Sequence, residues 1–117
     1  MTQKEKLPEY VEFEDWEKLD LRIGTIKAVE DHPDADKLYV LIVKFDEEPE
    51  RQVVAGLREH YKKEDLIGKQ VVVFTNLKPI TLRGIESNGM VLAAVNRKDK
   101  VILIKPEKKI DNNSKIK

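Results

Sequence analysis

Side chains that could do chemistry gather in residues 76–94, which read NLKPITLRGIESNGMVLAA and join two apolar runs. The stretch carries the cations Lys78 and Arg83 and then the tetrapeptide Ser87-Asn88-Gly89-Met90. Three turn-forming residues keep it out of any long regular element, and they are Pro79, Gly84 and Gly89. Two cations, an amide, a hydroxyl and a thioether in one loop suit contact with a polyanion that bears flat bases.

The chain has few side chains of the kinds that act as catalytic nucleophiles or bases. There is no cysteine, and the histidines and serines are His32, His60, Ser87 and Ser114. No pair of carboxylates stands in an evidently apolar stretch. A pairing of Ser87 with a distant histidine stays open as an alternative, but the composition favours a non-catalytic protein without a cofactor.

A metal site is an alternative for the segment DHPDADK, which follows the first apolar run. His32, Asp34 and Asp36 offer imidazole and carboxylate ligands, but they are closely spaced and lack an evident fourth ligand. The simpler interpretation is a turn, in which Pro33 fixes the backbone and the aspartates cap backbone amides. Lys37 then faces the ligand, and we expect no metal.

Length and composition indicate one soluble, cytoplasmic domain. The chain has 117 residues, of which 40% are hydrophobic, enough for a single core although burial stays incomplete at this size. The first ten residues, MTQKEKLPEY, lack the apolar core of a secretory signal, and no apolar run reaches the roughly 20 residues that span a bilayer. We expect residues 1–13 to be an extended lead-in and residues 14–117 to form the domain.

The charges are balanced overall but not along the chain. Lys and Arg number 22, and so do Asp and Glu. Residues 1–50 hold 7 Lys and Arg against 15 Asp and Glu, whereas residues 51–117 hold 15 against 7. A basic surface is therefore compatible with zero net charge, and the alternative is an evenly mixed, solvated Lys/Glu surface.

Hydrophobic periodicity predicts a mainly β protein. Residues 21–29 read as a strand whose apolar positions change face, and we expect a bend or bulge at Gly24 that lets one strand serve two sheets. An acidic-capped helical turn precedes it, and Trp16 is expected to pack on the core. The expected order is a helix at 14–18, strands at 21–29, 38–45 and 51–55, a helix at 57–67, and strands at 69–75, 89–95 and 100–104.

This order is that of an all-β oligonucleotide/oligosaccharide-binding (OB) fold, a five-stranded barrel with a short helix between its third and fourth strands, here with extra C-terminal strands. In such a barrel the connections at residues 31–37 and 76–88 border the ligand-binding face. Several strands, including LYVLIVKF at 38–45, are apolar on both faces. Because soluble monomers rarely expose large apolar patches, we expect an isologous homodimer to which the last strands contribute.

Five segments together resemble one family: LDLRIGTI, HPDADKLYV, RQVVAGL, DLIGKQVVVFTNLKP and RGIESNGMVLAA. They are similar to the tRNA-binding domain found at the C-terminus of many methionyl-tRNA synthetases, in free-standing dimeric tRNA-binding proteins and in auxiliary proteins of multisynthetase complexes. The similarity runs from about Phe13 to Ile116. It implies an OB barrel that binds tRNA by shape at its corner, as a free-standing accessory or as a subunit of methionyl-tRNA synthetase.

The resemblance also implies which side chains contact RNA. Cations neutralise phosphates, Asn and Ser donate to phosphate or ribose oxygens, and a methionine offers polarizable surface to a base, unless it packs in the barrel core instead. Carried over position by position, the RNA-binding residues are Lys37, Arg51, Asn76, Lys78, Arg83, Ser87 and Met90.

The chain departs from the family pattern in three places. Ile80 and Thr81 stand where relatives often place a basic residue, and Ala55 stands where a serine is common. In the tail, Asn113 replaces a usual glycine. Because Asn tolerates positive φ better than other non-glycine residues, we expect residues 105–117 to be ordered, at the dimer interface.

A rival interpretation belongs to another class of protein. Small dimeric secretion chaperones share this fold and resemble the chain in LDLRIGTI and DLIGKQV, but they bind unfolded peptides through apolar surface. The intact NLKP and SNGM segments favour tRNA. The salt dependence of binding separates the two, since affinity for phosphates falls steeply as salt rises.

Overall fold

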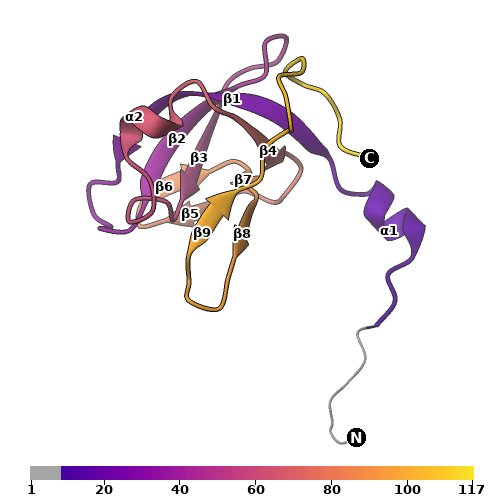
Figure 1. Cartoon of the computed structure of the whole chain (residues 1–117), viewed down its shortest axis with the longest axis horizontal. Coiled ribbons are helices and arrows are strands. Elements are labelled where there is room, and N and C mark those ends of the chain that lie inside the picture. The colour runs from indigo at the N-terminus through magenta and orange to yellow at the C-terminus, as the bar shows by residue number, and fades with distance from the viewer. Residues whose placement is uncertain (1–8) are drawn as a thin grey trace, which may run out of the picture.

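Strand β1, Leu21–Asp31, is the longest element and has a partner on each edge (Figure 1). The computed structural model describes residues 9–117. From Thr25 onward β1 pairs antiparallel with β2, Tyr39–Lys44, and up to Thr25 it pairs antiparallel with β4, Gln70–Phe74. The expectation that one strand serves two sides of a barrel is confirmed.

The irregularity in β1 lies three residues later than the sequence predicted. The register with β2 shifts between Ile26 and Ala28, so the bulge is at Lys27 and not at Gly24. Gly24 has another role, because a Cβ there would lie 2.6 Å from Cγ1 of Val43 and 2.8 Å from Cε1 of Phe45. The missing side chain makes room for Phe45 inside the barrel.

The main sheet has the order β3-β2-β1-β4-β7, with β3 at Arg51–Ala55 and β7 at Met90–Val91. The strand predicted at 89–95 is divided, because the backbone at Leu92 changes partners. Its N–H bonds to the Val72 carbonyl at 3.0 Å and its carbonyl accepts the N–H of Ile104 at 3.0 Å. Beyond it, β8 (Ala93–Val95) and β9 (Val101–Leu103) form a hairpin that stands out from the barrel (Figure 1).

Helix α1, Phe13–Glu17, confirms the expected helical turn at 14–18 within one residue and lies apart from the barrel (Figure 1). Acidic residues stand at its start as expected, with Glu12 at the N-cap and Glu14 and Asp15 in the first turn, but Glu12 makes no side-chain capping hydrogen bond. Trp16 is half-buried and packs against a small apolar cluster on the outside of the sheet. It therefore packs on this outer cluster instead of the barrel interior. No helix among residues 9–117 is long and apolar enough to cross a membrane.

Helix α2 is shorter than the sequence predicted. It spans Lys63–Leu66, one turn of the eleven-residue helix expected at 57–67. The backbone of Lys62 is extended, with ψ of 151°, which lies outside the helical region and so prevents an earlier start of the helix. Tyr61 is fixed by the barrel, since its carbonyl accepts the Tyr39 hydroxyl at 2.7 Å and its own hydroxyl accepts the Leu103 N–H at 3.0 Å. These tertiary bonds override the local helical pattern.

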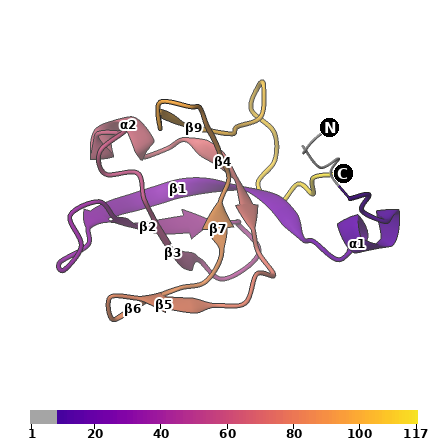
Figure 2. The same cartoon turned by 90° about the horizontal axis from the view of Figure 1, so that it is seen from below.

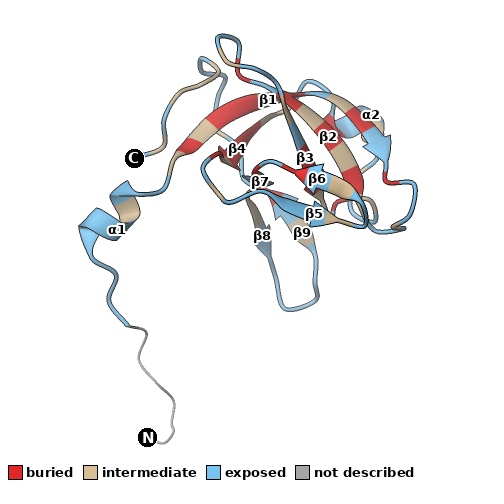
Figure 3. Ribbon diagram, turned by 180° about the vertical axis from the view of Figure 1, so that it is seen from behind, coloured by how far each residue is buried: buried red, intermediate tan, exposed pale blue. Residues whose placement is uncertain are grey.

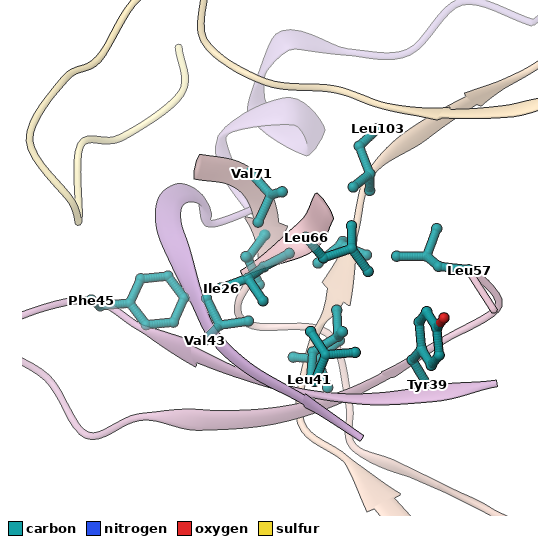
Figure 4. Close-up of a cluster of buried hydrophobic side chains, with 13 residues drawn as sticks. Ile26, Tyr39, Leu41, Val43, Phe45, Leu57, Leu66, Val71 and Leu103 are labelled. Atoms are coloured by element: carbon teal, nitrogen blue, oxygen red, sulfur yellow. The ribbon is translucent and has the colours of Figure 1, made fainter. Parts of the chain in front are cut away.

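Two apolar clusters hold the fold together. The larger fills the barrel, where side chains from β1, β2, β4, α2 and β9 point toward one another (Figure 4). The smaller lies outside the sheet, around Leu21, Ile23 and Val72. In β2 the inward residues are buried, but Val40 and Ile42 are only half-buried, so the expected cover on both faces is incomplete (Figure 3).

The tail is ordered along β1, as the sequence predicted. Asn113 has φ of 72°, so it takes the backbone conformation expected of the replaced glycine. Its N–H bonds to the Ile23 carbonyl at 2.7 Å. Lys115 forms an isolated antiparallel β-bridge with Arg22 through the backbone, and Ile116 packs on the outer cluster. Whether this segment lies in a dimer interface stays a prediction.

Candidate nucleic-acid interface

The segment predicted as a loop at 76–88 contains a short hairpin. Strands β5, Ile80–Leu82, and β6, Ile85–Ser87, pair antiparallel around Arg83 and Gly84. Both turn residues have positive φ, 52° and 87°, as a two-residue type I′ turn requires. The hairpin projects Arg83 at its tip, and Figure 2 shows it on the opposite side of the barrel from α2.

The hairpin lies against the connection between β1 and β2. Nη1 of Arg83 donates to the Asp34 carbonyl at 3.2 Å, and Nε2 of His32 lies 2.9 Å from the Leu82 carbonyl. We call residues 31–38 and 76–88 together the two-loop face. The expectation that these two connections border one surface agrees with these contacts.

Lys37 and Lys78 are exposed on the two-loop face. Among residues 9–117, no carboxylate oxygen lies within 4.0 Å of either ammonium group. Acidic side chains are exposed nearby in the same segments, at Asp34, Asp36 and Glu86. The face is therefore mixed in charge.

Arg51 is half-buried and bound within the protein. Its Nη1 donates to the Thr75 carbonyl at 2.5 Å, and its guanidinium carbon lies 6.0 Å from the centre of the Phe45 ring. The same nitrogen is 3.5 Å from Oδ1 of Asn88. Arg51 thus ties β3 to the end of β4, which leaves only part of its guanidinium for a ligand.

Asn76 is exposed, but both ends of its amide are occupied. Its Oδ1 accepts the N–H of Asp20 at 2.8 Å and its Nδ2 donates to the Lys18 carbonyl at 2.7 Å. The side chain fastens the segment between α1 and β1 to the end of β4. The structure therefore gives Asn76 a role in the fold, and its expected contact with RNA stays a prediction.

Ser87 is likewise bound within the protein. It is 2% exposed, and its Oγ accepts the N–H of Val54 at 2.9 Å and donates to the Gly89 carbonyl at 3.1 Å. Beside it, the N–H of Asn88 bonds to the Gln52 carbonyl at 2.8 Å. This buried hydroxyl joins β3 to the chain leading into β7, and its expected contact with RNA stays a prediction.

Met90 lies on the outside of the barrel. It is 45% exposed and pairs with Phe74 across β4 and β7. The alternative that it fills the barrel core is wrong. Of the predicted site residues, Lys37, Lys78, Arg83 and Met90 are therefore the ones with side chains open to a ligand.

The sequence did not predict that His32 and Arg58 hold the two-loop face together. His32 is buried and bonds to the hairpin, and Arg58 holds the other side of the same connection. Nη2 of Arg58 lies 3.4 Å from the Asp31 carboxylate, and its Nη1 donates to the Ala35 carbonyl at 3.4 Å. The sequence marked His32 only as a candidate metal ligand beside Asp34 and Asp36, whereas nothing local distinguished Arg58 from a surface cation.

The structure offers no clustered ligands for a metal within residues 9–117, where no three His, Cys, Asp or Glu side chains converge. Both ring nitrogens of His32 already have protein partners, at Leu82 and at the N–H of Asp34.

Elsewhere, Arg22 lowers the pKa of the Asp20 carboxyl below its ordinary value of 3.8, chiefly by a hydrogen bond of 2.8 Å. That ion pair lies beside the segment fastened by Asn76.

Comparison with known proteins agrees with this architecture. A family model described as a putative tRNA binding domain matches residues 21–115. A methionine–tRNA ligase from Thermococcus onnurineus is 52% identical over 108 residues, which are 92% of this chain but 14% of that protein. The ligase from Pyrococcus horikoshii is 49% identical over 113 residues, 97% of this chain and 15% of its own length. The chain thus spans about a seventh of these relatives.

Solved structures extend the comparison. The MetRS related protein from Pyrococcus horikoshii superimposes with a TM-score of 0.87 and 31% identity, covering 93% of this chain and 99% of that one. The chaperone CsaA from Bacillus anthracis gives a TM-score of 0.84 and 35% identity, covering 93% of this chain and all of that one. The barrel is common to proteins described as synthetase-related and as chaperones.

Proposed function

The chain belongs to the putative tRNA-binding domain family, and we propose that it binds folded tRNA in the cytoplasm, as a homodimer and without chemistry of its own. The observation that carries the proposal is the two-loop face, where two connections are fastened together and present Lys37, Lys78 and Arg83. A fixed set of separated cations suits recognition of backbone shape better than reading of base sequence.

Removal of two charges from residues 76–88 tests this contact. We expect Lys78→Gln with Arg83→Gln to weaken binding about tenfold or more at low salt for every tRNA species, and to make the salt slope less steep by about 1 to 2. The matched control is Arg97→Gln with Lys98→Gln, which removes the same charge from the exposed turn between β8 and β9. Equal losses in both variants would show that only net charge matters and would contradict the proposal.

A second copy of the chain is the proposed cover for the last strands. On the projecting hairpin, Val95 is 61% and Ile102 is 49% exposed, and Ile104 beyond it is also exposed. We expect Ile102→Lys to give monomers in a mass measurement while the barrel stays folded. Ile67→Lys alters an equally exposed isoleucine beside α2 and should leave the dimer intact. A wild-type monomer would contradict this part of the proposal.

The relatives indicate which system the chain serves. Because curated methionine–tRNA ligases contain a segment about 50% identical to it, we propose that the chain assists a methionyl-tRNA synthetase, as a subunit or as a free accessory. The expected effect is a lower KM for tRNA when the chain is added to a catalytic subunit that lacks this segment. An unchanged KM at saturating chain would remove this role and leave the binding of tRNA to be judged separately.

Binding of unfolded peptides is the second candidate. Apolar side chains are exposed on and beside the two-loop face, with Ile80 55% exposed in β5 and Met90 45% exposed in β7, and CsaA has the same barrel. Apolar binding should persist or strengthen as salt rises, whereas tRNA binding should weaken. A titration of bulk tRNA and of an unfolded peptide at low and high salt decides between them.

A further inference from the structure

His32 is the buried residue that joins the two connections of the proposed RNA-binding face. It is 2% exposed, although it lies in a turn whose neighbours Pro33 and Asp34 are exposed. Nε2 lies 2.9 Å from the carbonyl of Leu82 in β5, and Nδ1 lies 3.0 Å from the N–H of Asp34. One ring therefore binds both its own turn and the hairpin.

The partners of the ring define its protonation state. A carbonyl can only accept, so Nε2 carries a hydrogen and donates it to Leu82. A backbone N–H can only donate, so Nδ1 is unprotonated and accepts from Asp34. The geometry corresponds to a neutral imidazole in the Nε2–H tautomer, with both polar atoms satisfied.

Further hydrogen bonds near the ring also hold the two connections in place. The N–H of His32 bonds to the Leu38 carbonyl at 3.1 Å, which closes the turn that contains Lys37. Across the gap, Nη1 of Arg83 reaches the Asp34 carbonyl at 3.2 Å, but this contact comes from an exposed side chain at a hairpin tip. Of the two side-chain links between the connections, the buried one from His32 is the better shielded from water.

We propose that His32 is a positioning residue for tRNA: it sets the distance between Lys37 on one connection and Lys78 and Arg83 on the other, without touching RNA. The inference rests on the proposed function. A rigid spacing of cations lowers the entropic cost of fitting them to phosphates on a folded RNA. We call the two hydrogen bonds of the His32 ring the clamp. Without the clamp, each connection still carries its charges, but their arrangement is no longer fixed.

The test must separate positioning from general stability. His32→Phe keeps a ring of similar size and removes both hydrogen bonds, whereas His32→Gln keeps one amide donor and one acceptor. His60→Gln changes the exposed histidine and serves as the control for charge and composition. Val43→Ala opens a cavity in the barrel core and serves as a control for lost stability.

Two measurements are made on each variant of the full chain: the affinity for bulk tRNA, and the hydrogen exchange of the Asp34 amide and of the amides in β5 and β6. We expect His32→Phe to lose about tenfold in affinity, as follows from roughly one net hydrogen bond, and to exchange these amides faster. His32→Gln should lose less. Val43→Ala should lower the melting temperature without a matching loss of affinity.

The outcomes are distinct. Wild-type affinity in His32→Phe would overturn the proposal, and so would an affinity loss in Val43→Ala that follows its melting temperature in the same way as His32→Phe. Unchanged exchange of the Asp34 amide in His32→Phe would show that no clamp exists. Failure of the wild-type chain to bind tRNA would overturn the proposed function itself, and the exchange data would still show whether His32 fastens the two connections.

Discussion

The Oγ of Ser87 accepts the N–H of Val54 at 2.9 Å, and this bond closes the barrel between β3 and the segment that leads into β7. Both groups are buried, so neither can turn to water if its partner is removed. We expect Ser87→Ala to lower the free energy of unfolding by about 1–3 kcal/mol, the cost of a buried N–H without a partner.

Denaturant unfolding measures this loss as a lower midpoint at unchanged slope. Ser114→Ala is the matched control, because that hydroxyl donates to the Asp111 carbonyl in the tail and lies outside the barrel. Equal effects of the two substitutions, or none in Ser87→Ala, would contradict the role given to the Ser87 hydroxyl.

A methyl group at Gly24 should disrupt the packing inside the barrel. A Cβ there would lie 2.6 Å from Cγ1 of Val43 and 2.8 Å from the Phe45 ring, so β1 or both neighbours must move. We expect Gly24→Ala to cost about 1–3 kcal/mol of stability in thermal or denaturant unfolding. At Gly56 the nearest atom is 3.9 Å away, so Gly56→Ala should be nearly neutral, and a similar loss there would contradict this explanation.

The Asp20–Arg22 pair predicts a pH dependence. Arg22 lowers the folded-state pKa of Asp20 below its ordinary value of 3.8, so the folded state favours the ionised carboxylate. The stabilisation is therefore present above about pH 4 and is lost as the pH falls through the lowered pKa. We expect wild type to be more stable than Asp20→Asn at neutral pH, and the difference to shrink below pH 4.

Both side chains are about a quarter exposed, so water and salt screen the pair and the difference should be modest. Unfolding is measured for both proteins from pH 7 down to pH 2.5. Asp36→Asn, an exposed change outside the pair, serves as the control. A difference that grows on acidification would have the wrong sign for a lowered pKa.

The sequence predicted most of the barrel because alternating apolar residues report directly which strand face is buried. It misplaced what depends on distant partners. The bulge at Lys27 comes from register with β2, and the helix expected at 57–67 shrinks because Tyr61 bonds to Tyr39 and Leu103. The hairpin at 80–87 was missed because its turn uses Arg83 at positive φ, where Asn or Asp is the usual signal.

For the predicted site residues, residue type indicated which side chains are exposed but not which ones have partners within the protein. Lys37, Lys78 and Arg83 are long cations in turns, and such side chains reach solvent almost regardless of the fold around them. Asn76 and Ser87 have short polar side chains that bind nearby backbone as readily as a ligand, and sequence alone does not show which they do. The structure gives both of them backbone partners within the protein.

Asn76 supplies the sharpest comparison between these two roles. Its amide bonds to the backbone of Asp20 and Lys18 on either side of the link between α1 and β1. Asn76→Ala removes both bonds, and we expect a loss of about 1–2 kcal/mol in unfolding experiments together with faster hydrogen exchange at the Asp20 amide. The affinity for tRNA, measured below the onset of unfolding, should change less than about twofold. Lys78→Gln is the counterpart two residues along, with the opposite expectation of weaker binding at wild-type stability. A tenfold loss of affinity in Asn76→Ala would return Asn76 to the RNA site and show that its bonds to the backbone open when RNA docks.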